Sequence, residues 1–277
     1  MPDQQQTVTP LPEPQDYRHR GRLEGRVAIV TGSESGIGQA TAVEFAREGA
    51  DVAVTYFKDE AGAQQTRADI EALGRRAIVV HLDQRDEASV KALFDQTVRD
   101  LGTPDILVND AGIDATGKQV ADMTAQEWDD RIRTNLYGPF YACQQFIRLR
   151  RVAGGRGKII NVTSVHEDIP RAGASGYDSS KGALRNLTRT LALELAPDLI
   201  NVNNLAPGMV LTPMNQEAMD DPKVYAEQVQ SIPFKRAAQP WEMARLAVYL
   251  ASADADYATG QTFTLDGGLT MNQGQGA

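Results

Sequence analysis

Short apolar runs alternate with stretches of helical periodicity from about residue 23 to the end of the chain. Such runs, bounded by Gly, Pro, Asn or Asp and separated by helical patterns, indicate strands joined by helical crossovers. Strands connected in this way form a parallel sheet with helices on both faces. We expect about seven strands, near residues 27–30, 52–56, 77–82, 106–108, 158–162, 200–205 and 262–265. The sequence therefore predicts an α/β fold: a single doubly wound, Rossmann-type domain with a parallel sheet of about seven strands.

Composition narrows the classes of function. The 277 residues suffice for one large domain, and a formal net charge of −9 argues against nucleic-acid binding. No apolar run approaches the ~20 residues that cross a bilayer, so we expect no membrane partner. The three histidines, at positions 19, 81 and 166, lack metal-ligand spacing, and we expect no metal site. The single cysteine, Cys143, has apolar neighbours and is expected to be buried.

Two segments differ from the alternating pattern. Residues 1–22 are rich in Gln and Pro and lack the apolar core of a signal peptide, so we expect a flexible N-terminal arm, or a strap on the surface, of a cytoplasmic protein. Its basic run, residues 18–22, is interpreted as a solvated linker, with contact to a partner subunit or an anionic ligand as the alternative. The domain then spans 23–277, and its irregular segment 213–240 follows a strand end in the manner of a substrate-covering lid.

A glycine-rich turn, Thr31–Gly38, joins the strand at 27–30 to the next helix, with the spacing G-x-x-x-G-x-G. Glycines there permit unusual backbone angles and close approach, while the helix N-terminus attracts phosphate. The sequence predicts a dinucleotide at this turn.

The next two strand ends bear on the adenosine half of such a ligand. An acidic residue after Tyr56 would bind the ribose 2′-hydroxyl, but Phe57 and Lys58 follow instead. Lys58 could attract a 2′-phosphate, which favours NADP weakly, with dual use of NAD and NADP possible. Asp83, at the end of the third strand, either accepts a hydrogen bond from adenine or serves as a loop or cap residue.

Tyr177 and Lys181 are spaced i and i+4 in a predicted helix, with Ser164 thirteen residues upstream of the tyrosine. An ammonium beside a phenol favours the phenolate and lowers the phenol's pKa towards neutral pH. A serine hydroxyl opposite could hold a carbonyl or hydroxyl oxygen while the tyrosine moves its proton. This combination suits the interconversion of an alcohol and a ketone. Asn135, predicted on a helix from Trp128 to Phe146, should face inward.

In order and spacing, these motifs resemble those of the short-chain dehydrogenase/reductase family over residues 23–270. The resemblance implies that Tyr177 is the acid/base, that Lys181 lowers its pKa and binds the nicotinamide ribose, that Ser164 orients the substrate, and that Asn135 anchors a water in a proton relay. It also implies a homotetramer. The cofactor-binding set it implies comprises Gly32, Ser33, Ser35, Gly36, Ile37, Gly38, Tyr56, Lys58, Asp83, Asn109, Ala111, Gly112, Tyr177, Lys181, Pro207, Gly208, Val210 and Thr212.

One position departs from the family pattern. Where the family usually has Asn-Asn-Ala-Gly, this chain has Asn109-Asp110-Ala111-Gly112. We expect Asp110 to be tolerated if its carboxylate accepts backbone N–H groups; otherwise it would disturb the cofactor loop.

Within the family, the chain most resembles bacterial glucose 1-dehydrogenases and glucose/ribitol-type members, through the stretch from Ser164 to Pro170 and its neighbours. Asp114, His166 and Asn215, with Ser164, are therefore candidate contacts for a sugar or polyol. The alternative is that His166 only shapes a turn.

We expect an NAD(P)-dependent oxidoreductase that transfers hydride between nicotinamide and a secondary alcohol or ketone. The alternative substrate class is a small ketone or a 3-ketoacyl thioester. A nicotinamide-binding redox sensor without turnover is disfavoured, because a sensor needs no proton relay.

Overall fold

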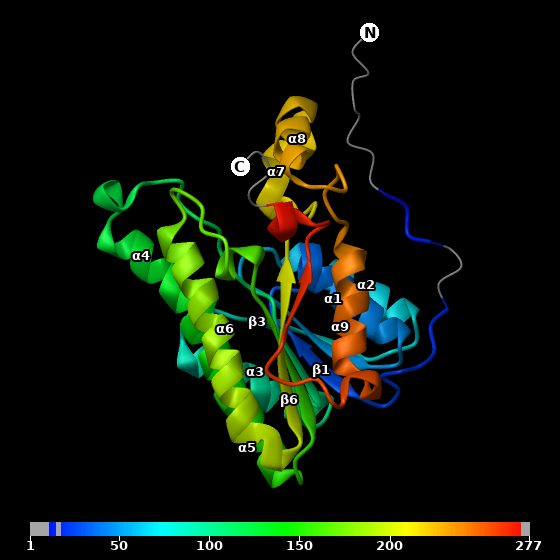
Figure 1. Ribbon diagram of the computed structural model, residues 1–277. Helices are drawn as coiled ribbons and strands as arrows, with labels where there is room; N and C mark the ends of the chain where they lie inside the picture. Colours follow the sequence, from blue (N-terminus) through cyan, green and yellow to red (C-terminus); the bar gives the residue numbers. More distant parts are fainter. Residues whose placement is uncertain (1–10, 15–17, 273–277) are drawn as a thin grey trace.

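The computed structural model describes residues 11–14 and 18–272. Within this part, one parallel sheet runs through the molecule in the order β3-β2-β1-β4-β5-β6-β7 (Figure 1). The chain winds outward from β1 in one direction and from β4 in the other, which confirms the predicted doubly wound sheet. The strands are β1 (Val27–Val30), β2 (Asp51–Tyr56), β3 (Ala77–His81), β4 (Ile106–Asn109), β5 (Gly157–Val162), β6 (Ile200–Pro207) and β7 (Thr262–Leu265).

Helices cover both faces of the sheet and divide the core in two (Figure 1). Because successive strand residues point to opposite faces, Ala28 and Val30 pack with Phe45 on one side, whereas Val27 and Ile29 pack with side chains such as Phe94 on the other. One face carries α1 (Gly36–Arg47), α2 (Glu60–Ala72) and α9 (Pro240–Ala251), and the other carries α3 (Glu87–Asp100), α5 (Gly138–Val152) and α6 (Ser175–Leu195). Cys143 is buried in the second core, as expected. Short 3₁₀ turns connect elements at η1 (Val120–Asp122), η3 (Val165–Glu167), η4 (Ala196–Asp198), η7 (Ala253–Ala255) and η8 (Leu269–Asn272).

The helix carrying Asn135 is not a continuous α-helix. The sequence predicts one helix from Trp128 to Phe146, but a π-helical turn, η2 (Arg133–Tyr137), separates α4 (Ala125–Ile132) from α5. The wider turn contains Asn135, whose side chain is hydrogen-bonded inside the protein. Single π turns of this kind are frequent at functional sites.

The predicted lid segment lies beyond the carboxyl end of β6 (Figure 1). It contains η5 (Pro213–Asn215), α7 (Gln216–Asp220), α8 (Pro222–Gln228) and η6 (Val229–Ser231). An isolated parallel bridge between Val210 and Ala238 joins the two ends of the segment. Closure of this segment over a ligand stays a prediction.

The described part of the N-terminal arm is held by ion pairs. Glu13 lies 3.1 Å from both Arg47 on α1 and Arg245 on α9. The buried carboxylate of Glu48 accepts the backbone N–H of Arg20 and the guanidinium of Arg22. The interpretation of residues 18–22 as a solvated linker holds in part: residues 18–21 are exposed, as expected, but Arg20 and Arg22 also donate to the buried acid at the end of α1. Residues 1–10 and 15–17 of the predicted flexible arm lie outside the described residues.

Over residues 11–14 and 18–272, no helix has the length and apolar character needed to cross a membrane.

Candidate active site

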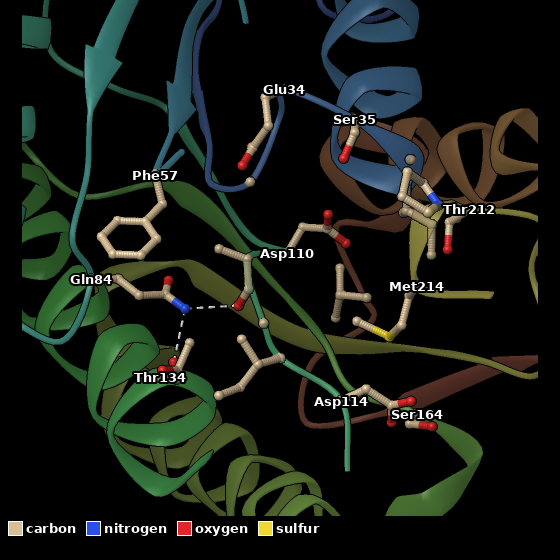
Figure 2. A pocket seen from close by; sticks show the side chains of 18 of the residues that line it. Glu34, Ser35, Phe57, Gln84, Asp110, Asp114, Thr134, Ser164, Thr212 and Met214 are labelled. Carbon is tan, nitrogen blue, oxygen red and sulfur yellow. Dashed lines mark hydrogen bonds between the residues drawn. The ribbon is translucent and has the colours of Figure 1, made fainter. Parts of the chain in front are cut away.

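A cleft of about 740 Å³ lies at the edge where the strands end. Because all the strands run parallel, the side chains that follow them meet at this one edge. The lining includes most of the predicted cofactor set: Gly32, Ser35, Gly36, Ile37, Tyr56, Lys58, Asp83, Ala111, Gly112, Tyr177, Lys181, Pro207, Gly208, Val210 and Thr212. Figure 2 shows Asp114, Ser164 and Met214 at one end of the cleft and Glu34 and Phe57 at the other.

The glycine loop has the shape of a phosphate cradle. Gly32 and Gly36 have positive φ angles of 68° and 57°, and a Cβ added to Gly32 would lie 2.8 Å from the Cα of Ala111. Helix α1 begins at Gly36, and Ser35 makes no side-chain capping bond to it. An uncapped helix N-terminus behind glycines fits the pyrophosphate of a dinucleotide.

Three of the predicted cofactor residues do not line the cleft. The Ser33 hydroxyl is buried, donates to the carbonyl of Val30 and accepts from the N–H of Thr55, so both of its bonds join β1 to β2. The Asn109 amide, also buried, donates to Asn161 at 2.8 Å. Gly38 lies behind the loop, where an added Cβ would be 2.3 Å from the carbonyl oxygen of Gly32. Their side chains, or lack of one, hold the cleft's framework together.

Asp110 lines the middle of the cleft (Figure 2). Its carboxylate faces the backbone N–H of Gly38 in the first turn of α1, which is the accommodation expected for an acid at this position. Burial raises the pKa of Asp110 to about 7, against the opposing influence of the Lys181 ammonium.

Helix α6 presents Tyr177 and Lys181 to the cleft on one face, as their spacing predicts. Burial raises the pKa of Tyr177 to about 12, while a hydrogen bond with Ser164 acts to lower it. The net shift is opposite to the lowering expected from Lys181. Burial prevails, and the Lys181 ammonium is bonded to the carbonyl oxygen of Val162 at 2.8 Å and lies 5.5 Å from the centre of the tyrosine ring.

Lys181 is itself strongly affected by its surroundings. Burial lowers its pKa to about 8, and the nearby Asp110 opposes this shift. Gly112 lies between the lysine and Asn135, because an added Cβ there would be 3.8 Å from Nζ and 3.3 Å from the Asn135 Oδ1. Asn135 does not line the cleft; its Oδ1 accepts the N–H of Ile113 at 2.9 Å and its Nδ2 donates to the Ile113 carbonyl at 3.0 Å. Its observed role is thus to hold the chain beside Gly112.

The four predicted substrate residues are not equivalent. Asp114 and Ser164 line the cleft, and Asp114 pairs with Arg171 at 3.1 Å. Asn215 also lines the cleft, but its amide donates to the carbonyl of Val210. The His166 ring packs edge-on against Tyr177, with Nδ1 2.8 Å from the carbonyl oxygen of Ile169, and the residue is absent from the cleft lining. Its position favours the turn-shaping interpretation of His166.

Among the cleft residues that sequence reasoning missed, Gln84 and Glu34 bear most on the site. Gln84 donates to the carbonyls of Ala111 and Thr134 at 2.9 and 2.8 Å, so it ties the Asn109–Gly112 turn to the π-helical turn (Figure 2). Glu34, within the glycine loop, places a carboxylate at the β2 end. The sequence signal for Glu34 was an acid in the loop together with the absence of an acid after Tyr56.

The carboxylate of Asp83 is paired with an arginine within the protein. Its carboxylate binds Arg85 through Nε at 2.9 Å and Nη2 at 2.7 Å, and these bonds hold the pKa of Asp83 below its usual range. An adenine contact by Asp83 stays a prediction.

A glycine cradle and a buried Tyr-Lys-Ser group in one cleft define a dinucleotide-dependent oxidoreductase site. Residues 31–270 match the family model described as enoyl-(acyl carrier protein) reductase. The chain belongs to the short-chain dehydrogenase/reductase family and, like its relatives there, is an NAD(P)-dependent oxidoreductase.

Similar proteins have several names within this family. Glucose 1-dehydrogenase 2 of Bacillus subtilis is 35% identical over 253 residues, covering 91% of this chain and 98% of that protein. The 3beta-hydroxysteroid dehydrogenase 1 of Eggerthella lenta is 40% identical over 252 residues, covering 91% and 96%. A gluconate 5-dehydrogenase from Burkholderia cenocepacia, solved with NADP and tartrate, is 34% identical with a TM-score of 0.84, covering 91% of this chain and 98% of that one.

The electrostatic coupling of Asp110 to Lys181 predicts a pH effect. Because Asp110 raises the pKa of Lys181, Asp110→Asn should lower it, and the Lys181 ionisation in a pH profile of kcat/KM should move to lower pH. The raised pKa of Asp110 means that its ionised form destabilises the fold, so the contribution of Asp110 to wild-type stability falls as pH rises from about 4 to about 7. The gain in stability of the variant over wild type should therefore be absent at the acid end and grow across this window, to no more than about 4 kcal/mol near pH 7.

Urea denaturation at several pH values measures this difference, with Asp95→Asn as the control because Asp95 is exposed and paired with Lys91 on α3. An Asp110→Asn profile that overlays the wild-type profile would contradict the coupling.

Proposed function

We propose that this protein oxidises a secondary alcohol group of a sugar or polyol, or reduces the corresponding carbonyl, with a nicotinamide dinucleotide. One observation carries the proposal: the Tyr177 phenol, the Ser164 hydroxyl and the Lys181 ammonium share a cleft with a glycine cradle for pyrophosphate. The dinucleotide, when bound, supplies the hydride acceptor or donor at C4 of its nicotinamide. The protein supplies the proton chemistry and the substrate pocket.

Each side chain of the group has a distinct task. As the substrate's C–H bond breaks to give up hydride, the Tyr177 phenolate accepts the hydroxyl proton and becomes the neutral phenol. In the reverse direction the phenol gives that proton to the carbonyl oxygen and becomes the phenolate. Ser164, already hydrogen-bonded with the phenol, holds the same substrate oxygen. Lys181 stabilises the phenolate that forms and binds the nicotinamide ribose. Asn135 keeps Ile113 and Gly112 beside the lysine and, by family resemblance, is proposed to anchor a water of the proton relay.

The substrate end of the cleft supports a hydroxylated substrate. Asp114, with 41% of its side chain exposed, offers a carboxylate next to Ser164, and its partner Arg171 is 49% exposed. This pair provides both an acceptor and a donor for polyol hydroxyls. Met214 adds an apolar wall. A small ketone or 3-ketoacyl thioester is the second candidate, because the same Tyr177 and Ser164 pair can protonate and hold a carbonyl oxygen.

Tyr177→Phe should lower kcat by at least about 100-fold, because the phenyl ring retains the packing and loses the proton. Dinucleotide affinity should change by less than threefold, as measured by calorimetry on the same preparations. Turnover of the variant equal to that of wild type would rule out Tyr177 as the acid/base.

A panel of aldoses, polyols, secondary alcohols and ketones, assayed by nicotinamide absorbance with both dinucleotides, identifies the substrate class. If polyols are turned over, Asp114→Asn should raise KM for the polyol by about 10-fold, since a charged hydrogen bond is worth about 1.5–3 kcal/mol, with little change for a simple secondary alcohol. Activity on ketones and none on sugars or polyols would transfer the proposal to the carbonyl-reductase class.

We further propose a homotetramer, located in the cytoplasm, where the nicotinamide dinucleotide pool is available. Trp128, Tyr137 and Phe140 on the α4–α5 side, and Phe234 and Tyr257 nearer the C-terminus, are exposed aromatic side chains of the kind enriched at protein interfaces. Light scattering after size-exclusion chromatography should give four chain masses. A mass of one chain would refute the assembly.

A further inference from the structure

The adenosine end of the cleft lacks the acid that usually follows the second strand. β2 ends at Tyr56, and Phe57 and Lys58 follow it in the lining. A carboxylate at this position accepts the ribose 2′-hydroxyl and repels a 2′-phosphate. The structure supplies a carboxylate from another element, because Glu34 of the glycine loop lies at the same end of the cleft as Phe57 (Figure 2).

The backbone fixes the position of Glu34. Its carbonyl oxygen packs against Gly62 of α2, where an added Cβ would lie only 2.5 Å away, so the loop is pressed onto the start of that helix. The N–H of Thr55 bonds the hydroxyl of the preceding residue, Ser33, which joins the loop to β2. Glu34 is therefore held beside the end of β2 by contacts on both sides.

One oxygen of the Glu34 carboxylate lacks a hydrogen-bond donor among the residues that the structure describes. The backbone N–H groups of Glu34 and Phe57 face it and act to lower its pKa, but burial prevails and raises the pKa. Among the residues that the structure describes, its Oε2 is buried and has no hydrogen-bond partner. A ribose hydroxyl that approaches the Glu34 carboxylate from the cleft would donate to it, whereas a phosphate dianion offers only acceptors and negative charge.

We propose that Glu34 binds the adenosine ribose hydroxyls and excludes a 2′-phosphate, so that the protein prefers NAD to NADP. The inference rests on the proposed function, and it replaces the weak preference for NADP that Lys58 suggested.

The cations nearby do not form a phosphate site. Arg85 makes two bonds to Asp83 and stacks over Phe57 at 5.1 Å. Lys58 is exposed, with its ammonium 5.8 Å from the Phe57 ring centre. A phosphate dianion beside Glu34 would therefore find only a solvent-exposed lysine and an arginine already paired with Asp83. It would also be repelled by a second carboxylate, Asp59, which lies close enough to raise the pKa of Glu34.

Calorimetric titration of the full-length protein tests the proposal without turnover. The probes are NAD and NADP, together with adenosine 5′-monophosphate and adenosine 2′,5′-bisphosphate, which carry the adenosine half alone. Wild type should bind each 2′-hydroxyl form at least 10-fold more tightly than its 2′-phosphorylated counterpart. Glu34→Gln keeps the side-chain shape and removes the charge, so it should reduce this ratio by 10-fold or more, through weaker NAD and stronger NADP binding.

Two further variants distinguish a direct contact between Glu34 and the ribose from a general effect of negative charge near the cleft. Glu60→Gln removes a charge at the start of α2, outside the cleft lining, and should leave the ratio within twofold of wild type. Glu87→Gln removes a charge at the start of α3, also outside the cleft lining, and should likewise leave the ratio within twofold of wild type. Equal effects of Glu34→Gln and Glu60→Gln, an unchanged ratio in Glu34→Gln, or equal or tighter binding of NADP by wild type would overturn the role of Glu34. Failure of wild type to bind either dinucleotide would overturn the proposed function itself.

Discussion

The buried ammonium group of Lys181 is the constraint on which the active-site arrangement depends. Removing a cation from water is costly, and its pKa falls to about 8 as a result. The site offsets part of this cost with the carbonyl oxygen of Val162 and with Asp110, which lines the same cleft. Gly112 packs against the same group, since an added Cβ there would lie 3.3 Å from the Asn135 Oδ1, a tight contact, and 3.8 Å from Nζ. The Asn109–Gly112 turn, the π-helical turn and α6 are thus fitted around one charge.

The protonation state of Tyr177 determines whether it can donate or accept a proton. With a pKa of about 12, the phenol holds its proton at neutral pH, which suits donation to a carbonyl oxygen. Alcohol oxidation requires the phenolate, and therefore additional positive charge or hydrogen bonding near the phenol oxygen. Ser164 already contributes in that sense, whereas the Lys181 ammonium is directed at Val162. The balance between these groups sets the fraction of Tyr177 that is ionised at a given pH.

Features that follow from local periodicity could be predicted from the sequence. Contacts between residues far apart in the chain could not. The alternation of strands and helices predicts the parallel sheet, and the i, i+4 spacing predicts that Tyr177 and Lys181 share a face of α6. The bridge from Gln84 to Thr134 spans 50 positions, and the pair of Arg171 with Asp114 spans 57, so neither leaves a local pattern. Ser33 fits the glycine-loop motif, yet its hydroxyl is used between β1 and β2, because the motif encodes the loop's shape and not the direction of each side chain.

The proposed reaction is direct hydride transfer between a carbinol carbon and nicotinamide in this cleft. The most direct measurement uses polyols and secondary alcohols with deuterium on the carbinol carbon, incubated with the full-length protein and oxidised dinucleotide. Mass spectrometry of the reduced dinucleotide should find one deuterium in its nicotinamide ring for each substrate oxidised. Reduced dinucleotide without the label, or substrate oxidised with the deuterium released to water, would contradict the account.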